Sequence, residues 1–124
     1  MKVIQTLADV QSLKNDERLP SFYVEEIYNQ FLWTYESVAE GEAIDDFSLE
    51  PHACIYHFDD ETDLQMLMNF AESIEYVDTE VVGGFKYFRI GIMRDHEMSV
   101  IYFLEGTLPD KTEKWLENQG DRHV

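Results

Sequence analysis

The stretch EYVDTEVVGGFKYFRIGIM, residues 75–93, decides the fold. Its first half alternates between apolar or β-branched residues and acids, which is the pattern of a half-buried strand. Gly83-Gly84 then supplies the backbone freedom that a tight hairpin turn requires. The second half resumes the alternation, with large apolar side chains at every other position. We therefore predict two antiparallel strands, Glu75–Val82 and Phe85–Met93.

The chain on either side of this hairpin extends it into a sheet. Arg94–Glu97 forms a turn, and Met98–Leu104 returns as the third strand of an antiparallel meander. Upstream, Ala53–Phe58 is apolar on both faces, which indicates an interior strand. We expect it to join the sheet beside a parallel neighbour, through a right-handed crossover. That crossover is a helix, capped by Asp59 or Asp60 and reaching Ile74.

Helical spacing of apolar residues predicts three further helices. The first is Thr6–Asn15, with Thr6 as its N-cap. The second is Ser21–Ala39, and the last is Asp110–Asn118. The core stripe of the second helix contains Val24, Ile27, Tyr28, Phe31, Tyr35 and Val38.

Together these elements predict a single α+β domain over residues 1–124. Their order is α-α-β-α-β-β-β-α. The sheet is expected to have four strands and to be mainly antiparallel, with the helices packed on one face.

The charge of the chain is concentrated in one half. There are 26 acidic and 9 basic residues, for a net charge of −17, yet Leu19–Phe85 holds no Lys or Arg among its acids. The apolar fraction of 44% and the aromatic fraction of 14% are too high for a disordered acidic tail. The acids therefore cover a folded domain. This charge argues against direct binding to nucleic acid or to an anionic membrane, because both require cations.

The single cysteine, Cys54, excludes an internal disulfide and fits a reducing compartment. The N-terminal residues do not form a signal sequence, and no window approaches the length of apolar chain that spans a membrane. We therefore expect a cytoplasmic protein with no membrane segment.

Two large aromatics fall outside the core stripe of the second helix. Phe22 and Trp33 are eleven residues apart, so they point nearly the same way, onto the polar face. Either other parts of the fold cover them, or they form an apolar contact for a partner or for a second copy of the chain. The acidic loop Glu40–Pro51 follows this helix. Its apolar residues Ile44, Phe47 and Leu49 are spaced to hold it against the core, but the sequence does not decide between a packed loop and a mobile one.

The alternative hypothesis is a ligand-binding, metal-binding or catalytic site around the strand Ala53–Phe58. His52, Cys54 and His57 resemble metal ligands, but alternation along a strand sends His57 to the opposite face from the other two. The acidic run Asp59–Asp63 has neither the glycine nor the ligand spacing of a calcium loop. A small homo-oligomeric ligand-binding domain, metal-binding domain or enzyme that uses these residues remains the alternative.

The leading hypothesis is a non-enzymatic acidic protein, without metal or cofactor, that docks on a basic protein partner. Such a partner would be a nucleic-acid-binding protein, a nuclease or a toxin. The carboxylates would imitate a phosphate track and occupy the positive groove of that partner. A homodimer through the two exposed aromatics is a further expectation, and a purely solvated acidic surface is the simplest alternative. The candidate partner-binding residues are Phe22, Glu25, Glu26, Trp33, Glu36, Glu40, Glu42, Asp45 and Asp46.

Overall fold

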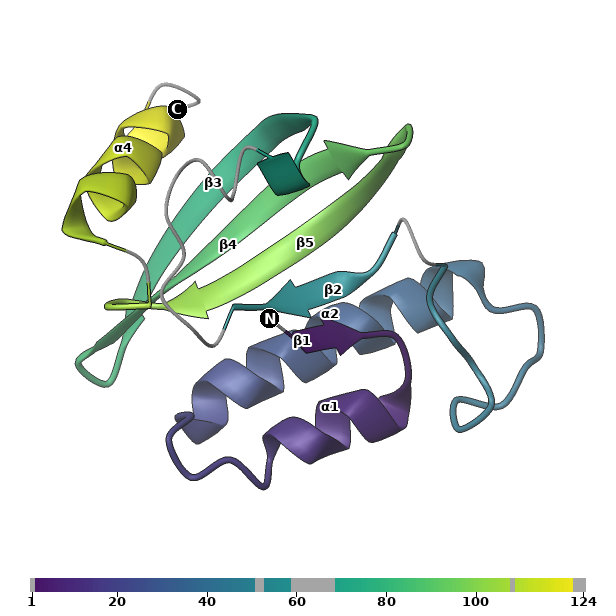
Figure 1. The fold of residues 1–124 in the computed structure, drawn as a ribbon. Helices are drawn as coiled ribbons and strands as arrows, with labels where there is room; N and C mark the ends of the chain where they lie inside the picture. The colour runs from purple at the N-terminus through teal and green to yellow at the C-terminus, as the bar shows by residue number, and fades with distance from the viewer. Residues whose placement is uncertain (1, 51–52, 59–68, 108, 122–124) are drawn as a thin grey trace.

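The computed structural model describes residues 2–50, 53–58, 69–107 and 109–121 (Figure 1). Its elements are, in order, β1 (Lys2–Ile4), α1 (Leu7–Leu13), α2 (Ser21–Val38), β2 (Ile55–His57), β3 (Ser73–Val82), β4 (Phe85–Arg94), β5 (Glu97–Leu104) and α4 (Asp110–Asp121). The described strands form one five-stranded sheet in the order β1-β2-β5-β4-β3. The fold is α+β, as the sequence predicts.

The meander of β3, β4 and β5 is confirmed. Val82 pairs with Phe85 across the turn, and both turn glycines have positive φ angles of 59° and 83°. These angles define the tight turn whose twist matches that of the flanking strands. The second turn reverses the chain between β4 and β5 with Asp95 and His96 in the same left-handed region, at φ 49° and 69°. The register of β4 with β5 then runs from Arg94–Glu97 to Tyr87–Leu104.

The sheet differs from the prediction in strand number. β2 lies parallel to β5, so it has a parallel neighbour as predicted, although the sequence did not specify which strand that would be. β1 adds a fifth strand, antiparallel to β2. β1 has three residues, too few for alternation to show in the sequence. It lies directly before α1, whose N-cap Thr6 forms a capping box with Asp9. The predicted N-cap is therefore confirmed, and the strand that precedes it was missed.

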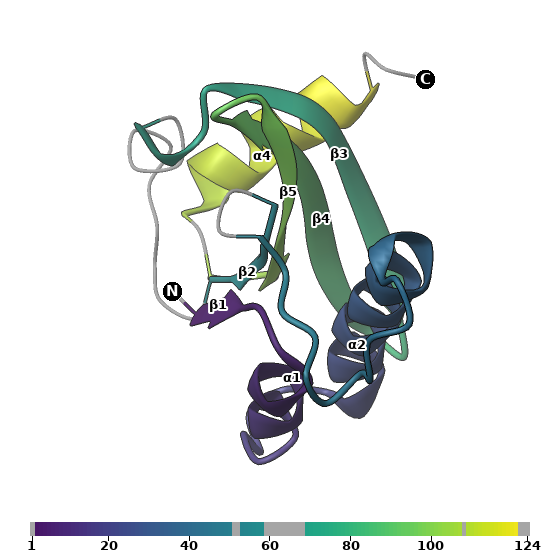
Figure 2. The ribbon, with the colours of Figure 1, turned by 90° about the vertical axis from the view of Figure 1, so that its right-hand side faces the viewer.

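The helices also differ from the prediction, because they cover both faces of the sheet. Tyr23 of α2 contacts the rings of His57, Tyr87 and Tyr102, so these three residues lie on the α2 face. The opposite face carries the stacked rings of Phe88 and Phe103. Lys86 lies on that face too and pairs with Glu117 of α4. In both ribbon views α4 lies apart from α1 and α2 (Figures 1 and 2).

Three smaller expectations are corrected. Ile74 belongs to β3 and not to the predicted crossover helix, and residues 59–68 of that prediction lie outside the described residues. Val38 was placed in the core stripe of α2 but is 59% exposed, because the helix ends there above the loop. Tyr23 was not in the stripe, yet it is fully buried between α2 and the sheet.

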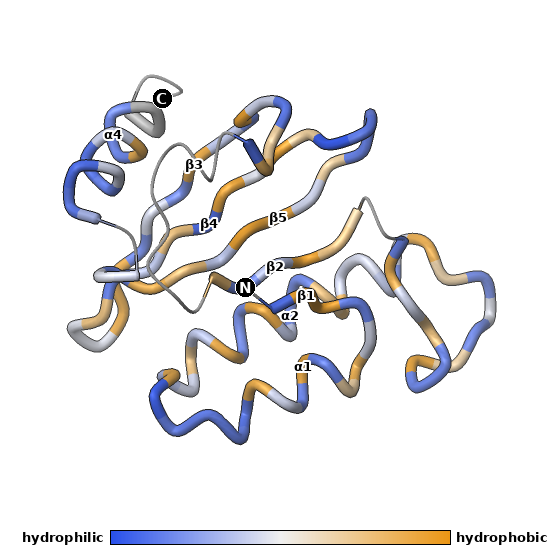
Figure 3. The backbone as a smooth tube through the Cα atoms, in the orientation of Figure 1, coloured by the Kyte–Doolittle hydropathy of each residue, from blue (hydrophilic) through white to orange (hydrophobic). Residues whose placement is uncertain are grey.

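The core follows the apolar positions of these elements. Hydrophobic residues run along β4 and β5, while the α1–α2 connection, the loop after α2 and α4 are largely hydrophilic (Figure 3). The buried set includes Ile4, Val10, Leu13, Ile27, Phe31, Phe88, Ile90, Ile92, Ile101, Phe103 and Leu116. Ile27 and Phe31 fix α2 against the sheet and so determine which side of α2 faces solvent. Phe88, Ile90, Ile92, Ile101 and Phe103 alternate onto the opposite face of the sheet, where α4 lies.

Candidate functional site

The outer side of α2 presents the exposed residues on which the hypothesis depends. Phe22, Glu26, Trp33 and Glu36 recur at spacings of four, seven and three residues, which place them along one side of a helix. We call these four residues the outer stripe. Trp33 is 66% exposed, and both glutamates are exposed. Glu25 is also exposed but lies on the flank of α2 that faces α1, in a separate groove with Tyr28.

The structure separates the two aromatics of the stripe. Phe22 is half-buried, with its ring centroid 6.1 Å from those of both Phe85 and Tyr87. The β3–β4 hairpin therefore covers it, which is the simpler of the two readings made from the sequence. Trp33 has no such cover among the described residues and is the aromatic of the stripe that stays available to a partner.

A groove of about 340 Å³ runs between the outer stripe and the sheet. Its walls are Glu26, Asn29, Gln30 and Trp33 of α2, Arg89 of β4 and Tyr102 of β5. These groups are an indole, a phenol, two amides, a carboxylate and a guanidinium. They offer a flat ring and several hydrogen-bonding groups, which is the composition of a binding surface.

Arg89 lines this groove, although the sequence did not predict a cation at this surface. Its Nη2 donates to Oε1 of Gln30 at 2.9 Å, and its Nη1 lies 3.7 Å from a carboxylate oxygen of Asp78. The guanidinium also stands 5.5 Å from the ring centroid of Tyr76. Arg89 thus joins α2 to β3. A signal for it existed, since residue 89 shares a strand face with Phe85 and Tyr87, but the cation lay outside the cation-free stretch.

The loop after α2 carries the remaining candidate acids. Glu40, Glu42, Asp45 and Asp46 are all exposed. The loop is held down by buried Phe47, whose ring centroid lies 5.9 Å from Phe31 and 5.2 Å from Tyr35, and by Leu49. The Leu49 amide donates to the Gln5 carbonyl at 2.8 Å. The hydroxyl of Tyr35 donates to the carbonyl of Glu42. The sequence left open whether this loop packs, and these contacts show that it does.

Exposure is a property of the whole described acidic stretch. Four of the sixteen carboxylates in residues 19–85 lie outside the described residues, and all of the other twelve are exposed. Besides the residues already named, they include Glu50, Glu72, Glu75, Asp78 and Glu80. This part of the surface therefore presents anionic groups to solvent from α2 and its loop to β3.

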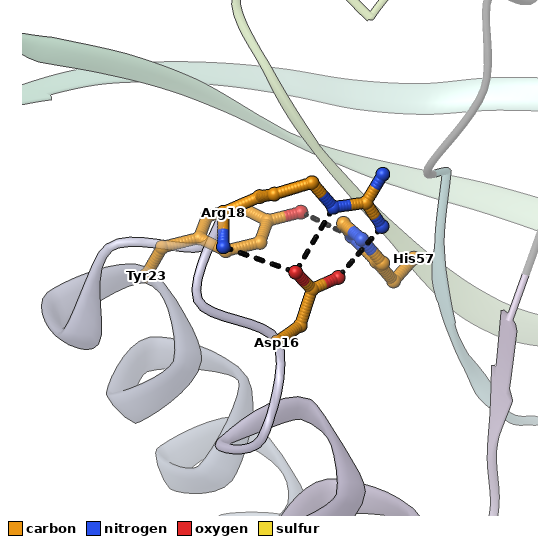
Figure 4. A network of polar contacts seen from close by, with 4 residues as sticks. All are labelled: Asp16, Arg18, Tyr23 and His57. Carbon is orange, nitrogen blue, oxygen red and sulfur yellow. Dashed lines mark hydrogen bonds and ion pairs between the residues drawn. The ribbon is translucent and has the colours of Figure 1, made fainter.

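Of the residues of the alternative reading, the structure describes Cys54 and His57, and these two do not converge on a site. His57 is 2% exposed, and its Nδ1 lies 2.7 Å from the hydroxyl of Tyr23, inside the α2 face (Figure 4). Burial raises the pKa of the Cys54 thiol, and its Sγ donates to the Glu50 carbonyl at 2.9 Å. A thiol held in this protonated form is a poor nucleophile. His52 and the run Asp59–Asp63 lie outside the described residues.

Figure 4 also shows an ion pair in the α1–α2 connection. Arg18 donates from Nε, from Nη2 and from its backbone amide to the carboxylate of Asp16, at 3.0, 2.8 and 3.0 Å. These hydrogen bonds, the side-chain ones first, hold the pKa of Asp16 well below its usual range. The pair organises the turn that leads into α2.

Among the described residues, no group of three or more His, Cys, Asp and Glu side chains is arranged to hold a metal ion. Nor does the described part contain a helix whose length and apolarity would let it cross a bilayer. The sequence matches no family model and no curated protein, and no solved structure matches the fold.

Proposed function

We propose that this chain is a non-enzymatic acidic protein that docks on a basic protein partner through the outer stripe of α2 and the loop 39–50. The single observation that carries the proposal is the setting of Trp33. It is 66% exposed on a packed helix, and exposed carboxylates precede and follow it at Glu26 and Glu36. Aromatic residues that are exposed in a free protein are common anchors at the centre of protein interfaces.

The charge around Trp33 favours a cationic partner. Glu36, Glu40, Glu42, Asp45 and Asp46 continue the anionic surface beyond the stripe, and residues 19–85 contain no Lys or Arg. Arg89 lines the groove beside Trp33, where it is already engaged by Gln30 and Asp78. Such a surface accelerates encounter with a basic protein and repels acidic ones. A protein whose own ligand is a phosphate backbone has the complementary groove, so nucleic-acid-binding proteins, nucleases and basic toxins are the partner classes favoured.

The surface is also suitably organised for binding. The helix is fixed by Tyr23, Ile27 and Phe31, all with no exposed area, so Trp33 and its neighbours are presented without a large ordering cost. The loop is fixed by Phe47 and Leu49. Partner binding would therefore require little rearrangement of the described backbone.

Affinity capture on the purified chain tests the proposal. At about 0.05 M salt we expect a basic protein to be captured, and at about 0.5 M salt we expect it to be released, because exposed charges are then screened. The same protein should be lost with Trp33→Ala and with the double variant Glu26→Gln/Glu36→Gln. The matched control is Glu72→Gln/Glu75→Gln, which removes the same charge away from the stripe and should keep the partner.

Two outcomes would count against the proposal. One is the absence of any basic protein at low salt, and the other is equal capture by the stripe variant and the control variant. Light scattering on Trp33→Glu distinguishes a homodimer from binding to another protein. If the wild type is a dimer and this variant is a monomer, Trp33 contacts a second copy of the chain.

A further inference from the structure

The outer edge of β3 is an unusual strand edge. Within the part of the chain that the structure describes, β3 pairs on one side with β4 and stands at the end of the sheet. The five residues Asp78–Val82 are all exposed. Natural sheets commonly protect such an edge with lysine, proline or a bulge, because its free backbone groups can pair with another chain. Residues 73–82 contain neither lysine nor proline, and the register irregularity of β3 lies between Ile74 and Tyr76, outside the exposed segment. Helix α4 contacts β3 but leaves Asp78–Val82 exposed.

The hairpin register identifies which backbone groups are free. The two-residue turn makes Val82 and Phe85 a hydrogen-bonded pair, and the pairing then alternates along β3. Asp78 and Glu80 therefore direct their amide and carbonyl groups toward Arg89 and Tyr87 in β4. Thr79 and Val81 direct theirs outward, away from the sheet.

The side chains along this edge have two different characters. On the α2 face, Asp78 lies near Arg89, and Glu80 accepts a hydrogen bond from the hydroxyl of Tyr87 at 3.1 Å. On the opposite face stand Thr79 and Val81, and Val81 is 67% exposed. At the hairpin end, Val82 and Phe85 are 41% and 54% exposed. An added strand would thus meet carboxylates on one face and apolar groups on the other.

Charge determines what kind of strand fits. In an antiparallel pair of two β3 strands centred on Thr79, each Asp78 would stand opposite the Glu80 of the other copy. Like charges directly opposite each other destabilise a strand pair, and each chain carries a net charge of −17. A strand with cations at alternate positions turns the same geometry into two favourable cross-strand pairs.

We propose that the outer edge of β3, Asp78–Val82, binds an extended segment of a basic protein as an added β-strand. Cationic side chains of that segment lie beside Asp78 and Glu80, and apolar ones lie beside Thr79 and Val81. This inference rests on the proposed function in one respect, the positive charge of the partner. The surface it concerns is the edge of β3 and not the outer stripe of α2. Backbone hydrogen bonds supply affinity, and the alternation of side chains supplies specificity.

A blocked peptide, Thr-Val-Lys-Val-Lys-Val-Thr, is the probe, and titration calorimetry on the full chain measures its affinity. The control peptide, Thr-Lys-Lys-Val-Val-Val-Thr, has the same composition but sends its two lysines to opposite faces of a strand. We expect the control to bind about fivefold more weakly or worse. Binding of the alternating peptide should also slow amide hydrogen exchange at Thr79 and Val81.

Variants locate the binding on the protein. Asp78→Lys/Glu80→Lys should abolish peptide binding. The control Glu36→Lys/Glu40→Lys makes the same change in net charge on the outer stripe and loop, and should keep the affinity within about threefold. Thr79→Pro removes an outward amide without removing a β3–β4 hydrogen bond, so it should also abolish binding. If that variant fails to fold, the lysine variants and the exchange data still decide.

The inference is overturned if both peptides bind equally, or if the amides of Thr79 and Val81 stay unprotected when peptide is bound. It is also overturned, with the proposed function intact, if the outer-stripe control loses the peptide while the β3 variant keeps it. If these amides become protected without peptide, and the protection rises with protein concentration, the edge binds a second copy of the chain instead. If neither the peptide nor any basic protein binds, both proposals fail.

Discussion

Replacing Gly91 by alanine tests how β3 and β4 pack on the α2 face. Gly91 pairs with Tyr76 across the two strands, and the tyrosine ring lies over the glycine. A Cβ atom at residue 91 would stand 2.0 Å from Cε1, 2.4 Å from Cδ1 and 2.7 Å from Cζ of Tyr76. Carbon atoms in contact are normally about 3.5 Å apart, so the ring has to move by roughly 1.5 Å.

The expected destabilisation follows from three contributions. Overpacking of this kind costs about 1–3 kcal/mol of unfolding free energy. Displacing the ring also weakens its contact with the Arg89 guanidinium, now 5.5 Å from the centroid, a contact of about 0.5–1 kcal/mol. Alanine in place of glycine restricts the unfolded chain and returns about 0.4–1 kcal/mol. The net loss is about 1–3 kcal/mol, or a fall in Tm of about 4–11 °C for a chain of this size.

A double-mutant cycle measured by urea unfolding provides the assay. The four proteins are the wild type, Gly91→Ala, Tyr76→Ala and the double variant. Once the ring at residue 76 is removed, Gly91→Ala should cost almost nothing or stabilise slightly. The reasoning is refuted if Gly91→Ala costs the same in both backgrounds, or if the single variant stays within about 0.5 kcal/mol of the wild type.

Two further predictions concern buried tyrosines. Tyr23→Phe removes the hydroxyl that lies 2.7 Å from Nδ1 of buried His57, and we expect a loss of about 1–3 kcal/mol by chemical denaturation. Tyr35→Phe is the control, because its hydroxyl bonds the Glu42 carbonyl at the exposed surface, and it should cost less than about 1 kcal/mol. Burial raises the pKa of Tyr87 and Tyr102 above the usual value of about 10. Because a raised folded-state pKa gives stability that is present below pH 10 and lost as the pH rises further, the protein should unfold in alkali. Phenolate absorbance should show that Tyr87 and Tyr102 ionise at a higher pH than the other tyrosines, in the same pH range in which circular dichroism is lost. Titration of all seven tyrosines at their ordinary pKa in the folded protein would contradict this.

Much of the fold could be predicted because its signals are local. Alternation and the Gly83-Gly84 pair specify the β3–β4 hairpin, and Thr6 with Asp9 specifies the start of α1. Strand β1 could not be predicted, since three residues carry no period. The position of α4 on the second face could not be predicted either, because it depends on the long-range contacts of Lys86 and Leu116.

The candidate site divides in the same way. Helical spacing placed Phe22 and Trp33 on one side of α2, but whether each was covered depended on which residues the hairpin brought there. Arg89 entered the groove through its partner Gln30, fifty-nine residues earlier in the chain. Strand alternation shows that Arg89 shares a face with Phe85 and Tyr87, but it does not show that Gln30 meets Arg89 there.

The sequence by itself determined the composition of this surface: a cation-free stretch of acids, a tryptophan on the polar side of a helix, and a hairpin whose first strand alternates acids with apolar residues. These are properties of local order and of side-chain chemistry. Only the tertiary structure decided that Phe22 is covered while Trp33 is open, that His57 is interior, and that β3 ends the sheet with Thr79 and Val81 facing outward. The physical reason is that burial and strand neighbours depend on which distant segments pack together, and local patterns constrain that packing without specifying it.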